Sequence, residues 1–310
     1  MHEPRGTTTL DEAYEPHAPQ ETRFVWPPKD GQNRHEHEST PADPARVAPV
    51  NALIESVELD LLARTGLSFD RWAARTGWSP DPREARCWRC AGLVGPYECD
   101  GEGCARCRSK PLAWDRAMCL GAYDGPLREH ILGLKFNGWR PSGDGLGKFA
   151  GERISSELQR SQIDPEHARI IPIPMHPIRR VHRGVDHTRI LARSASTAST
   201  ITWSPLLRAR YRPEQIGLSS TARARNIRDG FRIDRRKGRR LRSGAEGLPR
   251  VWVLVDDVRT TGATFVSACK VLRRFGRSLG LSREEQPKIW VCSIAVASSD
   301  RRSIKPQPDT

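Results

Sequence analysis

Several features that would classify a protein at once are missing from this sequence. No run of about 18 apolar residues occurs, so we expect no transmembrane helix and no insertion into a membrane. The first residues, MHEPRGTTTLDEAYEP, contain no apolar stretch of the kind that a signal peptide requires. The 310-residue chain is therefore expected to lie in the cytoplasm and to form one or two domains.

Two common phosphate-binding fingerprints are also missing. Neither G-x-x-x-x-G-K-[ST] nor G-x-G-x-x-G occurs, so the sequence predicts neither a P-loop nor a dinucleotide-binding fingerprint. Any site for a phosphate must therefore be built from a different kind of loop.

The cysteines are not dispersed as in a disulfide framework. Five of the eight fall between residues 87 and 107, and four of these form two C-x-x-C pairs. Two such pairs can direct four thiolates at one tetrahedral Zn²⁺, which leaves no open position for catalysis. We predict a structural zinc site with the ligands Cys87, Cys90, Cys104 and Cys107. A redox C-x-x-C is the alternative, and Cys99 either replaces one ligand or is spare.

Acidic residues are scarce beyond residue 80. Residues 1–80 carry 8 Lys/Arg and 13 Asp/Glu, whereas the rest of the chain carries 43 and 24. This basic balance favours a polyanionic ligand, either nucleic acid or a phosphorylated small molecule. A general arginine-rich composition explains the same numbers without a ligand. Residues 235–250 are interpreted as an exposed basic loop, either solvated or in contact with phosphates.

Apolar segments alternate with amphipathic ones from residue 112 onward, which predicts an α/β domain with a parallel sheet covered on both sides. The predicted strands are near-continuous apolar runs at 168–175, 250–257 and 288–297. The predicted helices include 184–196 and 262–276. We divide the chain into a disordered tail (1–50), a helical extension (51–84), a zinc ribbon (85–111), the α/β domain (112–300) and a second disordered tail (301–310).

Residues 253–264, VLVDDVRTTGAT, place two adjacent acids between a predicted buried strand and a short loop before a helix. Backbone N–H groups at a helix N-terminus bind anions. Gly262 and Ala263 allow a phosphate to approach, and the hydroxyls that can donate to it belong to Thr260, Thr261 and Thr264. Asp256 and Asp257 can accept hydrogen bonds from sugar hydroxyls or hold Mg²⁺. A ribose 5-phosphate unit unites these requirements.

The same segment resembles the loop that binds 5-phosphoribosyl-1-pyrophosphate (PRPP) in type I phosphoribosyltransferases. The resemblance implies that Asp256 and Asp257 hold the ribose 2′- and 3′-hydroxyls. It further implies that the 5′-phosphate is held by Arg259, Thr260, Thr261, Gly262, Ala263 and Thr264. The implied fold is a type I phosphoribosyltransferase-like parallel sheet with flanking helices.

Three further segments, 122–138, 170–192 and 212–231, narrow this resemblance to the ComF competence family. That family joins an N-terminal zinc ribbon to such a domain, and the similarity covers about residues 85–297. It implies a role in natural transformation, in which incoming single-stranded DNA is processed.

The resemblance also implies two loops around the pyrophosphate. The first is PIPMHPIRR, with the matching positions Pro174, Met175, His176 and Arg179. The second is RPEQIGLSSTARARN, whose Arg223 closes over the pyrophosphate, because a guanidinium pairs well with phosphate oxygens. A turn role for His176 and a local capping role for Arg223 are the alternatives. Lys135 is interpreted as an exposed helix-end lysine.

Three functions remain open at this point. The first is a PRPP-binding, phosphoribosyltransferase-like protein of DNA uptake. The second is an active phosphoribosyltransferase (a glycosyltransferase) of purine or pyrimidine nucleotide metabolism or salvage, with Mg²⁺ accompanying PRPP and with Asp256, Asp257 and Arg223 as catalytic residues. The third is a zinc-ribbon protein that binds single-stranded DNA or a DNA-processing helicase and keeps only a relic of the PRPP site. The sequence contains no recognisable signature for an acceptor base.

Overall fold

A computed structural model describes residues 69–175, 185–210, 230–244 and 247–297, all of which belong to one compact unit, Leu53–Thr310. The predictions for the two tails and for most of the helical extension lie outside the described residues. Of that extension the structure describes the helix α2 (Phe69–Thr76) and the 3-10 turn η1 (Arg83–Ala85). Within the described ranges, no helix is both long enough and apolar enough to cross a membrane.

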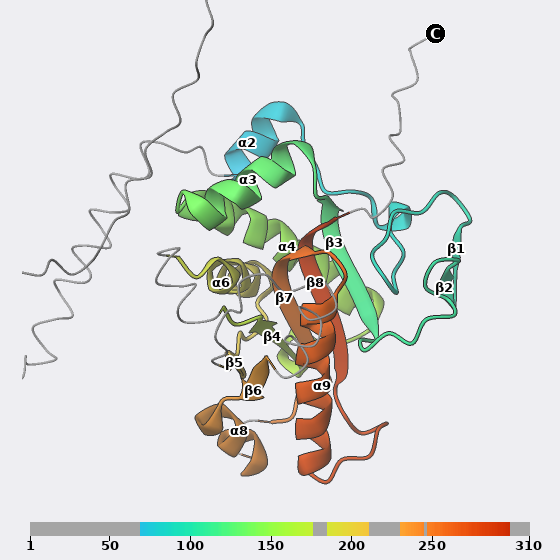
Figure 1. The fold of residues 1–310 in the computed structure, drawn as a ribbon, viewed down its shortest axis with the longest axis vertical. Helices are drawn as coiled ribbons and strands as arrows, with labels where there is room; N and C mark the ends of the chain where they lie inside the picture. The colour runs from blue at the N-terminus through green and yellow to red at the C-terminus, as the bar shows by residue number, and fades with distance from the viewer. Residues whose placement is uncertain (1–68, 176–184, 211–229, 245–246, 298–310) are drawn as a thin grey trace, which may run out of the picture. The chain divides into compact units, whose positions relative to one another are not determined.

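A four-stranded sheet organises this unit (Figure 1), and all of its ladders are parallel. Its strand order is β3 (Arg116–Ala122), β8 (Lys288–Val296), β7 (Val251–Arg259) and β4 (Ala168–Pro172). The central strands β7 and β8 are buried along most of their length, because helices cover both faces. The prediction of an α/β fold with a parallel sheet and flanking helices is confirmed.

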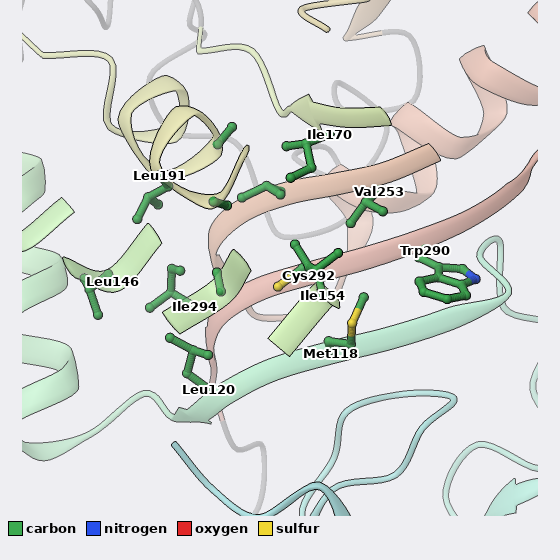
Figure 2. Close-up of a cluster of buried hydrophobic side chains, with 14 of the residues drawn as sticks. Met118, Leu120, Leu146, Ile154, Ile170, Leu191, Val253, Trp290, Cys292 and Ile294 are labelled. Atoms are coloured by element: carbon green, nitrogen blue, oxygen red, sulfur yellow. The ribbon is translucent and has the colours of Figure 1, made fainter. Parts of the chain in front are cut away.

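One face of the sheet is covered by α2, α3 (Gly125–Phe136), α4 (Arg140–Arg160) and α6 (His187–Ser199). Alternate strand residues point to this face, so Val253 and Cys292 pack with Leu146 and Leu191 of the helices (Figure 2). The 3-10 turn η2 (Pro165–His167) leads from this layer into β4.

The longest helix, α4, is not predicted by its own residues. Its sequence, RPSGDGLGKFAGERISSELQR, contains four glycines, which are poor helix formers in isolation. Three of them allow close packing against α6, whereas Gly145 faces Phe69 and Asp70 of α2. A Cβ at Gly147 would lie 2.7 Å from the carbonyl oxygen of Leu191, and one at Gly151 would lie 2.5 Å from that of Ala195. Tertiary packing therefore overrides a local sequence that resembles a loop.

The opposite face is covered by α9 (Ala263–Ser278) and by the antiparallel pair β5 (Leu207–Ala209) and β6 (Phe231–Ile233). β6 leads into α8 (Arg235–Arg242), which corrects the interpretation of 235–250 as a loop. The side chain of Asp234 accepts hydrogen bonds from the amides of Arg236 and Lys237, and the long unbranched side chains that follow favour a helix.

Candidate functional site

The cysteine module precedes the sheet and contains one small antiparallel pair, β1 (Cys99–Asp100) and β2 (Gly103–Cys104). The sulfur atoms of the four predicted ligands, Cys87, Cys90, Cys104 and Cys107, all lie within 4.8 Å of one another. Three of the Sγ–Sγ distances are 3.7 Å. Four sulfurs at about 2.3 Å from a tetrahedral Zn²⁺ would lie about 3.8 Å apart.

The four thiols are therefore already arranged for a metal ion such as zinc, as predicted. Cys87 is fully buried, and its hydrogen bond with Cys90 lowers the pKa of the Cys87 thiol to about 4. The contact with Cys87 raises the pKa of Cys90, and burial raises that of Cys107, so the shifts of the clustered thiols differ in direction. Cys99 lies opposite Cys104 in the ladder between β1 and β2, but its sulfur is not a member of the cluster. Cys99 is thus the spare cysteine of the module.

The two acids lie inside β7, near its carboxyl end, and the strand extends two residues beyond the predicted end at 257. β7 continues to Arg259 and pairs Val258 with Ala295 of β8. The Asp256 carboxylate accepts a hydrogen bond of 2.9 Å from the amide of Asp257. The Asp257 carboxylate accepts one of 2.6 Å from the amide of Val258. The backbone therefore fixes the orientation of both side chains.

Asp257 has one ion pair and one histidine contact that the sequence does not reveal. Its Oδ2 lies 2.8 Å from Nζ of Lys135 in α3 and 2.8 Å from Nε2 of His187 in α6. Burial alone would raise the pKa of Asp257, but the contact with His187 and the charge of Lys135 outweigh it and lower the pKa to about 2. Lys135 is therefore not an exposed helix-end lysine, because its side chain is only 17 % exposed. Neither partner carries a local sequence signal, since each comes from a distant helix.

Asp256 is in the opposite electrostatic state. Burial raises the pKa of its carboxyl well above the ordinary value, and the negative charge of Asp257 adds to the effect. Neighbouring acids whose pKa values are pushed apart can take different roles. Asp257 is a paired anion at neutral pH, whereas Asp256 can carry a proton or accept a hydrogen bond from a ligand.

The loop after β7 has the predicted strand–loop–helix form. Gly262 has a left-handed backbone, with φ at 78°, and α9 begins at the next residue. Thr260 and Thr261 are exposed, and the Thr261 hydroxyl accepts a long hydrogen bond of 3.4 Å from the amide of Ala263. The threonine hydroxyls and the N-terminal amides of α9 thus follow the carboxyl end of the strand that carries the two acids. We name residues 256–264 the aspartate loop; they comprise the end of β7, the connection after it and the first two residues of α9.

Arg259 is the first residue of the predicted phosphate-binding set, and its side chain leaves the loop. Its guanidinium points to the cysteine module, where Nη2 donates to the carbonyl oxygen of Cys90. Burial lowers the pKa of this arginine. The side chain of Trp114 also connects the two regions, because Nε1 donates to the carbonyl oxygen of Arg89 at 3.0 Å and the ring faces Gly262. Trp114 is not among the residues that the sequence singles out.

The other predicted residues are divided between described and undescribed segments. Pro174 and Met175 follow β4, next to β7, and Ile173 donates its amide to the carbonyl of Val255 at 2.9 Å. The structure therefore brings these two residues to the same sheet edge as the aspartate loop. His176, Arg179 and Arg223 lie outside the described residues.

No family model matches the chain. Over 179 residues, or 56 % of its length, the chain is 28 % identical to "DNA utilization protein YhgH" of Escherichia coli strain K12, of which 72 % is covered. The protein of the same name from Salmonella typhi is 28 % identical over 175 residues, with the same coverage. "Competence protein F" of Haemophilus influenzae is 27 % identical over 192 residues, which are 61 % of this chain and 79 % of that protein. The cysteine module, the parallel sheet and these relatives together identify the chain as a relative of the ComF competence family.

Proposed function

We propose that this protein binds PRPP at the aspartate loop and acts in DNA uptake or DNA utilisation. The observation that supports PRPP binding is the position of Asp256 and Asp257 near the carboxyl edge of a parallel sheet, in the strand whose following loop leads into the N-terminus of α9. Ligands of open α/β sheets bind at this edge, and helix N-termini favour phosphate. The names of the relatives support the role in DNA metabolism.

The geometry suggests a role for each group. The amides of residues 261–264 and the exposed threonine hydroxyls receive the 5′-phosphate. Asp256 accepts a hydrogen bond from a ribose hydroxyl, while Lys135 and His187 hold Asp257 as an oriented anion beside it. Mg²⁺ bound with PRPP would neutralise the pyrophosphate, and Asp256 is the carboxylate that fits such an ion, because the charge of Asp257 is already paired.

Calorimetric titration with PRPP and Mg²⁺ tests this site. We expect the wild-type protein to bind, and Asp256→Asn to weaken the affinity at least about tenfold, since a neutral amide neither holds Mg²⁺ nor accepts as strongly from a hydroxyl. Asp164→Asn is the matched control, because Asp164 is exposed and precedes the opposite end of β4. Absence of binding in the wild-type protein would refute the proposal. A panel of purine and pyrimidine bases added to the bound complex would test transfer through release of pyrophosphate.

One surface favours a second function, contact with nucleic acid. Residues 230–244 contain seven Lys/Arg and one acid, Asp234, which is already paired with Arg208 at 2.7 Å. A cavity of about 320 Å³ lies between α8, β6 and α9, and its arginines are Arg210, Arg232, Arg235, Arg242 and Arg274. We call these five residues and the exposed cations of α8 the arginine patch. Such a density of guanidinium groups suits the phosphates of a nucleic-acid backbone.

A salt titration with a fluorescent oligothymidylate tests the arginine patch. We expect the affinity to fall as salt rises, because binding to phosphates releases counterions. Arg235→Gln with Arg239→Gln should make the plot of log affinity against log salt shallower by about 0.7 for each phosphate that the variant no longer neutralises. Arg71→Gln with Arg75→Gln on α2, at the opposite end of this unit (Figure 1), is the matched control. Equal slopes for both double variants would exclude the arginine patch as the binding surface.

A further inference from the structure

The first C-x-x-C turn is joined to the α/β part through its backbone. We call residues 87–91 the first knuckle. Its four successive carbonyl groups, those of residues 88–91, each accept a hydrogen bond from outside the cysteine module. The carbonyls of residues 88 and 89 accept from the amide of Ala117 and the indole of Trp114, respectively. The carbonyls of residues 90 and 91 accept from the guanidinium of Arg259 and the thiol of Cys119. The knuckle is therefore part of the packed unit rather than a separate appendage.

Two of these donors come from, or contact, the aspartate loop. Arg259 is the last residue of β7, and its own carbonyl accepts a hydrogen bond of 2.9 Å from the amide of Ala297. Its backbone is thus held by the sheet while its side chain is held by Cys90. A partly buried guanidinium needs such acceptors, because an unpaired buried charge is costly. Arg259 fixes the end of β7 relative to a metal-ligand residue.

Trp114 makes the second connection. Its ring lies so close to Gly262 that a Cβ at this glycine would be 3.0 Å from the indole carbon Cη2. The ring also packs edge-on against Phe265 in the first turn of α9, with 6.2 Å between the ring centroids. The indole N–H meanwhile donates to the knuckle at Arg89. One side chain therefore links the first knuckle to both the loop glycine and the helix that follows it.

We propose that the metal-bound first knuckle holds the aspartate loop in its binding conformation through Arg259 and Trp114, so that metal and phosphate ligand bind cooperatively. The metal orders the Cys87–Cys90 turn, and its removal releases the carbonyls on which both side chains depend. The ligand part of this inference rests on the proposed function. Arg259 is then a positioning residue that acts through the loop, not a ligand of the 5′-phosphate.

A thermodynamic cycle that combines zinc removal with the substitution Arg259→Gln tests the coupling in the full-length protein. PRPP–Mg²⁺ affinity is measured for zinc-loaded and chelator-treated protein, each as wild type and as Arg259→Gln. We expect zinc removal to weaken PRPP binding by the wild-type protein about tenfold, a usual size for coupling between sites. In Arg259→Gln, zinc removal should weaken PRPP binding less than in the wild type, because only Trp114 still links the first knuckle to the aspartate loop. A direct phosphate ligand would instead give the same weakening in both zinc states.

The reciprocal measurement uses wild-type protein and a chromophoric chelator that competes for zinc. Saturating PRPP should raise the zinc affinity by the same factor by which zinc raises the PRPP affinity, because coupling between two binding sites is reciprocal. Arg259→Gln and Trp114→Phe, which keeps an aromatic ring but removes the N–H donor, should release zinc faster even without PRPP. Arg108→Gln is the control, since Arg108 lies on the module, pairs with Asp100 and has a side chain that is 48 % exposed.

The outcomes for PRPP and for zinc are separable. A wild-type protein that binds no PRPP refutes the proposed function. In that case the zinc-release rates of the variants still test whether Arg259 and Trp114 stabilise the first knuckle. PRPP affinity that is equal with and without zinc overturns the cooperative coupling. Zinc release that is equal in wild type, Arg259→Gln and Trp114→Phe overturns the role of both side chains.

Discussion

Replacement of Cys87 and Cys104 by serine is expected to abolish stoichiometric metal binding and to destabilise the whole unit. Both cysteines are buried, and each contributes one of the four sulfurs of the cluster. Binding of structural Zn²⁺ contributes about 10–16 kcal/mol to the folding of small zinc-binding peptides. Because the first knuckle supplies four carbonyl acceptors to the α/β part, its disruption should also lower the thermal midpoint of the sheet domain, by several degrees or more.

Metal analysis and thermal unfolding of the same samples measure this effect. Cys99→Ser is the matched control, because Cys99 is only partly buried and its sulfur lies outside the cluster. It should retain one zinc per chain and an almost unchanged midpoint. The assignment of the four ligands would be contradicted if the double variant retained its zinc, or if Cys99→Ser lost as much zinc as the double variant. A midpoint that is unchanged despite the removal of zinc would contradict the link between the knuckle and the sheet.

The parts of the fold that the sequence predicts are those whose signals are local. The apolar runs of β7 and β8 and the helix after Gly262 are visible in the residues themselves, and so is the spacing of the two C-x-x-C pairs. α4 escapes prediction because its glycines are explained only by α6 and α2, which pack against them. The cations of α8 suggest a solvated loop, although Asp234 is a recognisable N-cap for a helix.

In the candidate site, too, local features can be predicted from the sequence, whereas those that depend on tertiary packing cannot. The two acids can be found from the sequence because they adjoin a buried strand and a small-residue loop. Their environment cannot, because Lys135 and His187 reach Asp257 from helices that precede it by many residues. Arg259 illustrates the reverse case. The family resemblance places it in the phosphate-binding loop but says nothing of its side chain, whose hydrogen bond to Cys90 depends on how the cysteine module packs.

Lys135→Met is expected to lower the free energy of unfolding by about 2–3 kcal/mol at pH 7. Removal of one partner from a buried ion pair costs about 3–5 kcal/mol, and His187 remains beside Asp257 to reduce this cost. Urea unfolding measures the change. Lys148→Met, on the exposed side of α4, is the matched control and should change the stability by less than about 0.5 kcal/mol.

The pH dependence of the same variant tests the cause. The pKa of Asp257 is lowered from 3.8 to about 2, so the unfolded chain takes up this proton first as the pH falls. The stability that the pairing contributes is therefore fully present above about pH 5 and disappears as the pH falls toward 2. The difference between wild type and Lys135→Met should shrink over that window. Adding Asp257→Asn to Lys135→Met should restore part of the stability, because no unpaired carboxylate remains. A difference that is constant from pH 7 to pH 3 would show that Lys135 stabilises the fold by packing alone, not through the charge of Asp257.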